Sequence, residues 1–438
     1  MDSDFHYYGT GTAALAAGFS EKDSITIANV AQYHDWFHSD YWSYWYIVDD
    51  KGKKVKDSSG NSYHYEYPQL TSQNLDWKMI ADYNGNIWTP FHFPPGNVKY
   101  TVDGSDAGAK GSWKSVFNAH HIVQKTRLDS GNTSKLCRPF SRFAMDMIED
   151  TVKQYNELSG ADGDELANKI SALVAPRRRC PVTDGRKLAI YLLGIRLHVL
   201  SDTWAHQDFT GSINKEVNGA GLVNDVYIRD ENGEYRLASW TGTIYVFHDD
   251  TDSAAAPNVI KNPGHGQLGH LPDYSWAHFK YPASWLPEEE NYHIRDNPGE
   301  YKNAWSWLSH TMKLCRGDLT DDQIQNEPAQ PPQDISKVIE TYHPLSTKAL
   351  TAVPASEELW KKTALGKKLP ERWIIEEREK LGLHDGLAST RYGWINVRQN
   401  STLHCMETAA AIHYQFCVDW AAKHNDNGYS WTLWKPIT

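Results

Sequence analysis

One stretch, residues 186–211, constrains the fold more than any other part of the sequence, which reads RKLAIYLLGIRLHVLSDTWAHQDFTG there. From Leu188 to Trp204 the stretch is apolar almost all round, a pattern that predicts a helix buried in a large core. A helix of this kind needs other helices on every side. We therefore predict a mainly α-helical fold, a multi-helix bundle around a central buried helix over 186–207, with β-hairpin segments inserted.

The predicted central helix carries His198, Asp202 and His206, spaced four residues apart. Each step of four turns a helix by only ~40°, so the three side chains lie on one narrow face. An unpaired buried polar group costs roughly 2–7 kcal/mol, so these side chains need partners. Imidazole and carboxylate are ligand types that zinc prefers. The pattern therefore indicates either a metal site or a hydrogen-bonded network in the core.

Further ligand-type residues come before this helix. Asp4 and His6 stand two apart in a segment that we expect to be extended, which would place both on the same side. Asp35 ends the small-residue face of a helix that Ser20 is expected to cap, and should point inward. His92 stands between two phenylalanines in an aromatic run with the pattern of a strand. Each of these residues alone is more typical of a cap or of a surface group.

A second dense group follows in the Gly/Pro-rich stretch 263–282, which contains His265, His270 and Asp273. Glycine lets a backbone wrap tightly around an ion. The sequence does not decide which of the two histidines would be the ligand, and an ordinary loop with exposed histidines is the alternative.

The order of these residues resembles the zinc-dependent phospholipase C and single-strand nuclease superfamily, whose members are helical proteins with a trinuclear zinc site. The match is closest on the central helix and covers about residues 4–273. The chain also looks like a family of uncharacterised microbial proteins, through the segments DFHYYGTGTAALAAGFS, AQYHDWF, FHFPPG, HVLSDTWAHQ and GHGQLGHLPD.

The resemblance implies a ligand set for two or three zinc ions. One ion would be held by Asp35, His92, His198 and Asp202. Asp202 would bridge to a second ion that also uses His6. The third ion would be held by His206, Asp273 and either His265 or His270. In the superfamily the N-terminal amine is also a ligand, and here Asp4 would have to take its place.

The composition limits the classes of function and the cellular location that we expect. The net charge of −11 argues against general binding to nucleic acid. No apolar run is long enough to span a membrane, and the acidic N-terminal segment lacks a signal-peptide core, so we expect a protein of the cytoplasm or one exported without a cleavable signal peptide. Five scattered cysteines without a CxxC motif predict reduced, mostly buried thiols.

The expected organisation has three parts. Residues 1–316 would form a helical metal-site domain with β excursions at 41–100 and 212–260. The polar, Pro-containing stretch 317–335 is the expected linker. Residues 336–438 would form a C-terminal helical region packed on the first domain.

The function expected from the ligand set and the resemblance is metal-dependent hydrolysis of a small-molecule or lipid phosphoester, with zinc as the metal. By the resemblance, Asp35 would orient the attacking water or take its proton. One alternative is a hydrolase of another ester or amide bond with fewer metals; the dipeptide His34-Asp35 is similar to that of HD phosphohydrolases. The other is a non-enzymatic binding protein with a structural metal and an aromatic-rich surface. The sequence identifies no partner protein.

Overall fold

The computed structural model of the 438-residue chain describes most of the sequence. The described residues are 1–37, 44–65, 69, 71–72, 87–102, 112–173, 179–212, 214–220, 225–238, 264–344, 352–370 and 394–424.

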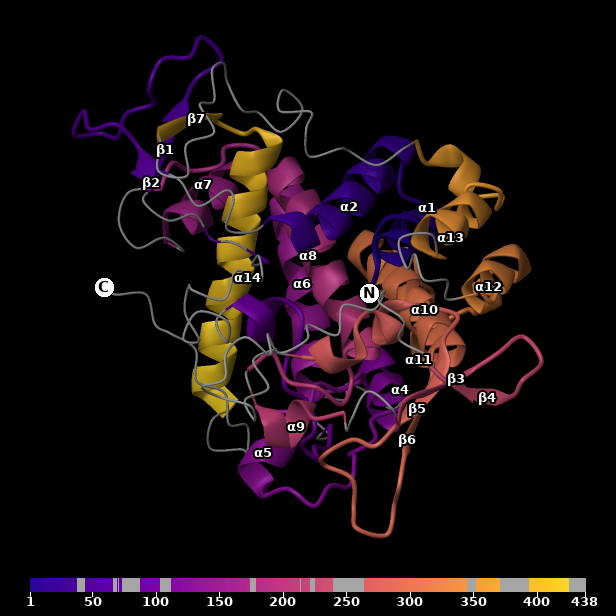
Figure 1. Cartoon of the computed structure of the whole chain (residues 1–438). Helices are drawn as coiled ribbons and strands as arrows, with labels where there is room; N and C mark the ends of the chain where they lie inside the picture. The colour runs from indigo at the N-terminus through magenta and orange to yellow at the C-terminus, as the bar shows by residue number, and fades with distance from the viewer. Residues whose placement is uncertain are drawn as a thin grey trace.

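Helix α8, Gly185–Ala205, is buried at all but two of its residues. Its first turn is capped by Asp184, whose side chain accepts a hydrogen bond from the backbone N–H of Lys187. Around it in Figure 1 pack α2 (Glu21–Tyr33), α6 (Arg142–Ser159), α7 (Gly163–Leu173), α10 (Asn297–Arg316) and α14 (Thr402–His424). The prediction of a mainly α-helical protein is confirmed.

A glycine brings two of these helices close together. A Cβ atom on Gly194 of α8 would lie 2.7 Å from a side-chain carbon of Val30 and 3.2 Å from the carbonyl oxygen of Ile27, both on α2. Only the missing side chain allows this approach. It sets the end of α2, and with it the following turn η2 (His34–Trp36), beside the polar face of α8.

The N-terminal segment is helical from the start. A π-helical stretch, η1 (Asp4–Gly9), runs into α1 (Thr10–Ala16), and Ser20 then caps α2 as predicted. The expectation of an extended segment at Asp4 and His6 is therefore wrong. In a helix, residues two apart point to nearly opposite sides, because each residue turns the chain by about 100°.

The remaining described helices are short. They are α4 (Trp113–Ala119), α5 (Ser130–Ser134), α9 (Lys215–Asn218), η5 (Gly266–Leu268), η6 (Leu271–Asp273), α11 (Asp321–Gln325), α12 (Gln333–Glu340), α13 (Ala352–Trp360) and η8 (Gly366–Lys368).

Two small sheets flank the helices. In the first, β1 (Tyr44–Val48) pairs antiparallel with β2 (His64–Tyr65) and parallel with β7 (Trp394–Arg398). The second has the order β4-β3-β5-β6 and consists of β3 (Tyr227–Arg229), β4 (Tyr235–Leu237), β5 (His278–Tyr281) and β6 (His293–Asp296). The β3–β4 hairpin lies within the expected β excursion at 212–260, of which residues 239–260 lie outside the described residues.

The aromatic run around His92 is not a strand. Residues 87–91 form a helical turn, closed by bonds from the backbone N–H groups of His92 and Phe93 to the carbonyl oxygen of Trp88. Pro90 explains the difference, because it has no N–H to donate to a sheet and its fixed φ suits the first turn of a helix, where N–H groups lack intrahelical partners.

The C-terminal part of the chain packs directly on the first part. Helix α14 lies against α8, and β7 extends the sheet of β1. One hydrophobic core cluster contains buried residues from Met1 to Ala421. The division of the chain at 317–335 stays a prediction.

Two expectations about chemistry can be compared with the described residues. All five cysteines are buried and none is in a disulfide, as predicted. Within the ranges described above, no helix has both the length and the apolarity that crossing a membrane requires.

Candidate metal centre

The polar face of α8 forms one wall of a buried cluster. His198 and Asp202 have no exposed surface, and His206 is only 5% exposed. His206 caps the C-terminus of α8 and still donates its backbone N–H to the carbonyl oxygen of Asp202. The three predicted side chains therefore share one face, as the spacing of four requires.

A buried arginine holds the C-terminal end of α8. The Arg295 guanidinium donates to the backbone carbonyl oxygens of Trp204, Ala205 and Gln207, at 3.0–3.1 Å. The last carbonyls of a helix have no intrahelical partner, and a cation there also compensates the helix dipole. Arg295 thus fixes the position of the chain at His206.

The first group of ligand-type atoms gathers on one oxygen of Asp202. Its Oδ2 lies 3.0 Å from both His92 Nδ1 and His198 Nε2, and these two nitrogens are 3.2 Å apart. Asp35 Oδ1 lies 3.8 Å and 3.6 Å from the same nitrogens. Ligands on a tetrahedron with bonds of about 2.1 Å are separated by roughly 3.4 Å. The five distances given, 3.0–3.8 Å, bracket this value, as expected for ligands of a tetrahedral zinc ion.

The second group gathers on the other oxygen of Asp202. Its Oδ1 accepts a hydrogen bond from the N-terminal ammonium of Met1 at 2.6 Å and lies 3.2 Å from His6 Nε2. Asp35 Oδ2 is 3.8 Å from that same His6 nitrogen. Asp202 and Asp35 thus each direct one oxygen toward the first group and the other toward the second.

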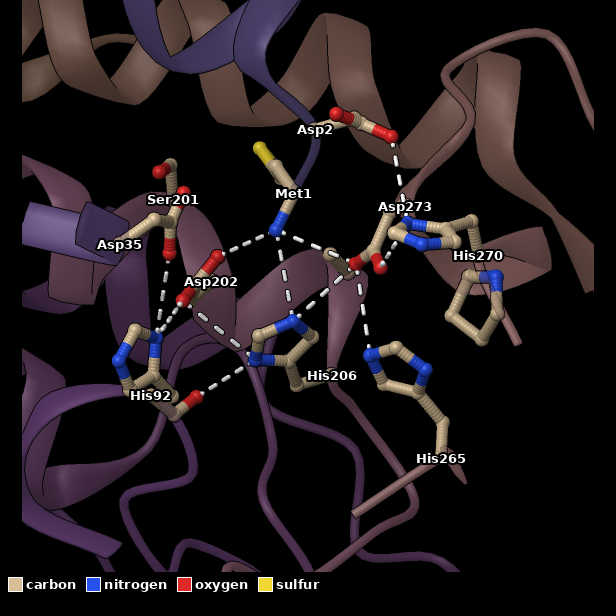
Figure 2. Close-up of polar contacts among 12 residues, drawn as sticks. Met1, Asp2, Asp35, His92, Ser201, Asp202, His206, His265, His270 and Asp273 are labelled. Carbon is tan, nitrogen blue, oxygen red and sulfur yellow. Dashed lines mark hydrogen bonds and ion pairs between the residues drawn. The ribbon is translucent and has the colours of Figure 1, made fainter. Parts of the chain in front are cut away.

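The expectation that Asp4 joins this group is wrong. Asp4 is buried, but its Oδ2 accepts a hydrogen bond from Ser356 on α13, on the opposite side of η1 from His6. The helical conformation of η1 separates the two side chains. The amine of Met1 occupies the place for which Asp4 was expected (Figure 2).

The third group is formed by His206, His265 and Asp273. Asp273 Oδ1 lies 3.2 Å from His206 Nε2 and 3.4 Å from His265 Nε2. The Met1 nitrogen is 3.3 Å from the same oxygen, so it stands between the second and third groups. His270 lies at the edge of this group: its side chain is 53% exposed, and its Nδ1 is 3.3 Å from Asp2 Oδ2 and 3.7 Å from Asp273 Oδ2.

The histidine rings are oriented by backbone carbonyls. Four rings each have one nitrogen at 2.8 Å from a carbonyl oxygen, in the pairs His92 Nε2 with Thr71, His198 Nδ1 with Ala31, His206 Nδ1 with His92, and His265 Nδ1 with Gly269. A carbonyl can only accept, so the nitrogen facing it carries the hydrogen. In a neutral ring the other nitrogen, which here faces the carboxylates, then has a free lone pair. Metal-binding histidines are oriented in this way.

The charges of the cluster are strongly coupled. Burial lowers the pKa of His6 and of His206 to about 4, so both rings are neutral at pH 7. Burial alone would raise the pKa of Asp202, but His206 and the Met1 ammonium hold it well below its usual range. Desolvation and the facing carboxylate of Asp202 instead raise the pKa of Asp35 well above its usual range. A further cation would favour ionised Asp35.

We expect the metal-free protein to lose stability as the pH falls from about 6.5 toward 4. An unfolded histidine binds a proton below about pH 6.5, whereas His6 and His206 in the folded protein stay neutral down to about pH 4. Between these two pH values the unfolded state binds more protons than the folded state, so the free energy of unfolding decreases as the pH decreases. Urea unfolding at a series of pH values measures the slope. The change of unfolding free energy with pH should be smaller in a His206→Gln variant. An unchanged pH dependence in that variant would contradict the inference that His206 is neutral in the folded protein.

At high pH the sign reverses. Although burial would lower it, Asp202 and Asp273 raise the pKa of the Met1 ammonium from 8.0 to about 11. This ion pairing stabilises the folded protein fully below pH 8 and is lost as the pH rises from 8 through 11. The joint contribution of His6, His206 and the Met1 ammonium to the free energy of unfolding should therefore be greatest between about pH 6.5 and 8.

Comparison with known proteins places the chain in a family. A family profile matches residues 1–419, nearly the whole chain. The chain belongs to DUF6765, a family of unknown function. The matched range of this DUF6765 protein contains every residue of the three groups. No curated protein and no solved structure matches the chain.

Sequence reasoning left two members of the cluster out. The resemblance indicated an N-terminal amine as a ligand, but Asp4 was expected in place of the Met1 amine, which no residue pattern marks. His34 lies beside His92 and His198 and could share a metal with them. Its only signal in the sequence is that it directly precedes Asp35.

Proposed function

We propose that this DUF6765 protein is a metal-dependent hydrolase with a polynuclear zinc centre that acts on phosphoesters. The observation that carries the proposal is the arrangement around Asp202. Each of its two oxygens faces a separate set of donors, and the ring nitrogens of His92, His198 and His206 that face away from their carbonyl partners point toward it or toward Asp273.

Three metal-binding sites, called seats below, are proposed for the ions. The first is formed by Asp35, His92, His198 and Asp202. The second is formed by the Met1 amine, His6 and Asp202. The third is formed by His206, His265 and Asp273. The donors are imidazole nitrogens and carboxylate oxygens with, in the second seat, an amine, a set that suits zinc better than magnesium or calcium.

Bound zinc would act as a Lewis acid, which lowers the pKa of a coordinated water to about 7. The chain's own part begins with Asp202, which would serve two neighbouring ions, an arrangement that stabilises both the attacking and the leaving oxygen of an in-line displacement at phosphorus. Asp35 is the most exposed carboxylate of the first two groups, with 29% of its side chain accessible. We propose that Asp35 orients the attacking water through one carboxylate oxygen and accepts its proton there.

The substrate class follows from this arrangement. A pair of cationic seats that share a carboxylate suits an ester whose oxygens carry negative charge, so a small-molecule or lipid phosphoester is the proposed substrate. A hydrolase of carboxylic esters or amides, with the same centre, remains the second candidate. In a non-enzymatic binding protein the metal would be purely structural, and its removal would unfold the protein.

Elemental analysis of protein purified without a His-tag tests the centre directly. We expect two or three zinc equivalents per chain in the wild type and their loss in the double variant His198→Ala/Asp202→Ala. Circular dichroism checks that the variant is folded. A wild type without stoichiometric transition metal would overturn the proposal, and the cluster would then be a hydrogen-bonded network in the core.

Activity assays separate the remaining alternatives. Zinc-loaded protein should hydrolyse a chromogenic phosphodiester or a phospholipid, and chelation should abolish this hydrolysis. Hydrolysis of p-nitrophenyl acetate or an anilide without phosphodiester cleavage would favour the ester and amide alternative. Zinc binding without any hydrolysis, together with unfolding on chelation, would favour a structural metal.

A further inference from the structure

His34 is a buried histidine that the proposed seats leave unused. It begins the turn η2, directly before Asp35, and its side chain has no exposed surface. Within the described part of the chain, neither of its ring nitrogens has a hydrogen-bond partner. An imidazole has a donor or an acceptor at each nitrogen, and leaving these unpaired in the interior destabilises the folded state. A role of His34 as a ligand of a metal ion would account for this burial.

The surroundings of His34 are other histidines. Its ring stacks on His198 with the ring centroids 4.0 Å apart, and it meets His92 edge-on at 5.2 Å. One ligand nitrogen from each of the three rings lies within 4.8 Å of the others.

The first seat has one loosely placed member. The side chains of His92, His198 and Asp202 are at most 1% exposed, and their ligand atoms lie 3.0–3.2 Å apart. Asp35 is 29% exposed and lies farther from both histidines, at 3.6–3.8 Å. The residue that precedes Asp35 in the same turn thus approaches the same two rings from within the core.

We propose that His34, His92 and His198 form a three-histidine seat for a divalent transition metal, overlapping the seat that uses Asp35. An ion there is held by three neutral imidazoles, so the carboxylate of Asp35 is free to act on water while the ion stays bound. Imidazole ligands favour zinc, copper or nickel over magnesium and calcium. This inference rests on the proposed function, because it assigns a further ligand to the same centre.

The test compares wild type, His34→Phe, Asp35→Ala and the double variant, each stripped of metal and reloaded with zinc against a chromogenic chelator. Phenylalanine keeps the ring and its stacking but has no nitrogen. We expect His34→Phe to weaken one zinc about 10–100-fold, the range seen when the support of a ligand is removed. Asp35→Ala should weaken the same ion less than about 10-fold, and the double variant should lose it.

Controls separate ligation from a role in packing. The same substitution at His310, a buried histidine on α10 whose Nε2 also has no partner, should leave zinc affinity unchanged. Metal-free His34→Phe should melt no lower than metal-free wild type, because an unpaired polar ring has been replaced by an apolar one, whereas the zinc-loaded variant should melt lower than zinc-loaded wild type. If His34→Phe does not fold, His34→Gln takes its place with the same expected loss of affinity.

Three results would count against the proposal in distinguishable ways. Equal zinc affinity in His34→Phe and wild type would overturn the three-histidine seat and leave the proposed centre standing. A double variant that binds zinc as well as Asp35→Ala would do the same. Absence of zinc in the reloaded wild type would overturn the proposed function itself.

Discussion

Replacing Asp202 with asparagine should remove at least two zinc equivalents and abolish hydrolysis. The carboxylate has one oxygen toward His92 and His198 and the other toward His6 and the Met1 amine. Asparagine keeps the shape but has one oxygen, and its amide N–H group faces either imidazole lone pairs or an ammonium. It can serve neither seat well.

The same substitution should destabilise the metal-free protein by about 3–5 kcal/mol, because the Met1 ammonium is then left buried with a weakened set of counter-charges. Elemental analysis and urea unfolding give the two quantities separately. The matched control is Asp208→Asn: Asp208 is also fully buried, forms ion pairs with Arg138 and His293, and lies outside the three groups. That variant should lose stability and keep its zinc. An Asp202→Asn protein with its full complement of zinc would rule out the bridging role.

The second large effect is expected from Arg295→Leu. This substitution removes the donors to three carbonyl oxygens at the end of α8 and to the Asn297 side chain. Leaving several buried acceptors unpaired should cost about 3–5 kcal/mol of unfolding free energy. Because His206 follows the released turn directly, zinc in the third seat should also bind about 10–100-fold more weakly.

Urea unfolding and chelator competition measure the two effects of Arg295→Leu. Arg229→Leu is the control, because Arg229 makes an exposed hydrogen bond to the carbonyl oxygen of Gly233 and should matter little to either quantity. If the variant Arg295→Leu had the same urea midpoint of unfolding as the wild type, the end of α8 would be held by other contacts.

The sequence predicted well what depends on local periodicity. The continuous apolar surface of α8 located the central helix within two residues at each end, 185–205 against 186–207. Helical spacing alone placed His198, Asp202 and His206 on one face. These properties need no knowledge of the rest of the chain.

The errors arose where local conformation was ambiguous. Asp4 was expected on the same side as His6 because the segment was taken to be extended, and the helical conformation of η1 reverses that placement. The choice between His265 and His270 depended on how a glycine-rich loop turns. Spacing in such a loop does not fix direction. In the structure the largely buried His265 faces Asp273 Oδ1, whereas His270 is half exposed and lies between Asp2 and Asp273 Oδ2.

The contribution of the Met1 amine and of His34 could not be predicted from local patterns. A main-chain nitrogen has no residue signature. His34 reaches His92 and His198 only because α2 approaches α8 closely at Gly194, which is a consequence of tertiary packing.

The long separation of the donors along the chain bears on how the protein is made. His6 and Asp273 belong to neighbouring seats, although most of the polypeptide lies between them. During synthesis the third seat cannot close before residue 273 has left the ribosome, and contacts between such distant segments form slowly. An ion that binds only the finished arrangement would stabilise it by about 4 kcal/mol at a thousand times its dissociation constant. Uptake of metal would then mark the completion of folding, and mutations that slow the docking of residues 264–273 would yield metal-poor protein even when every ligand is present.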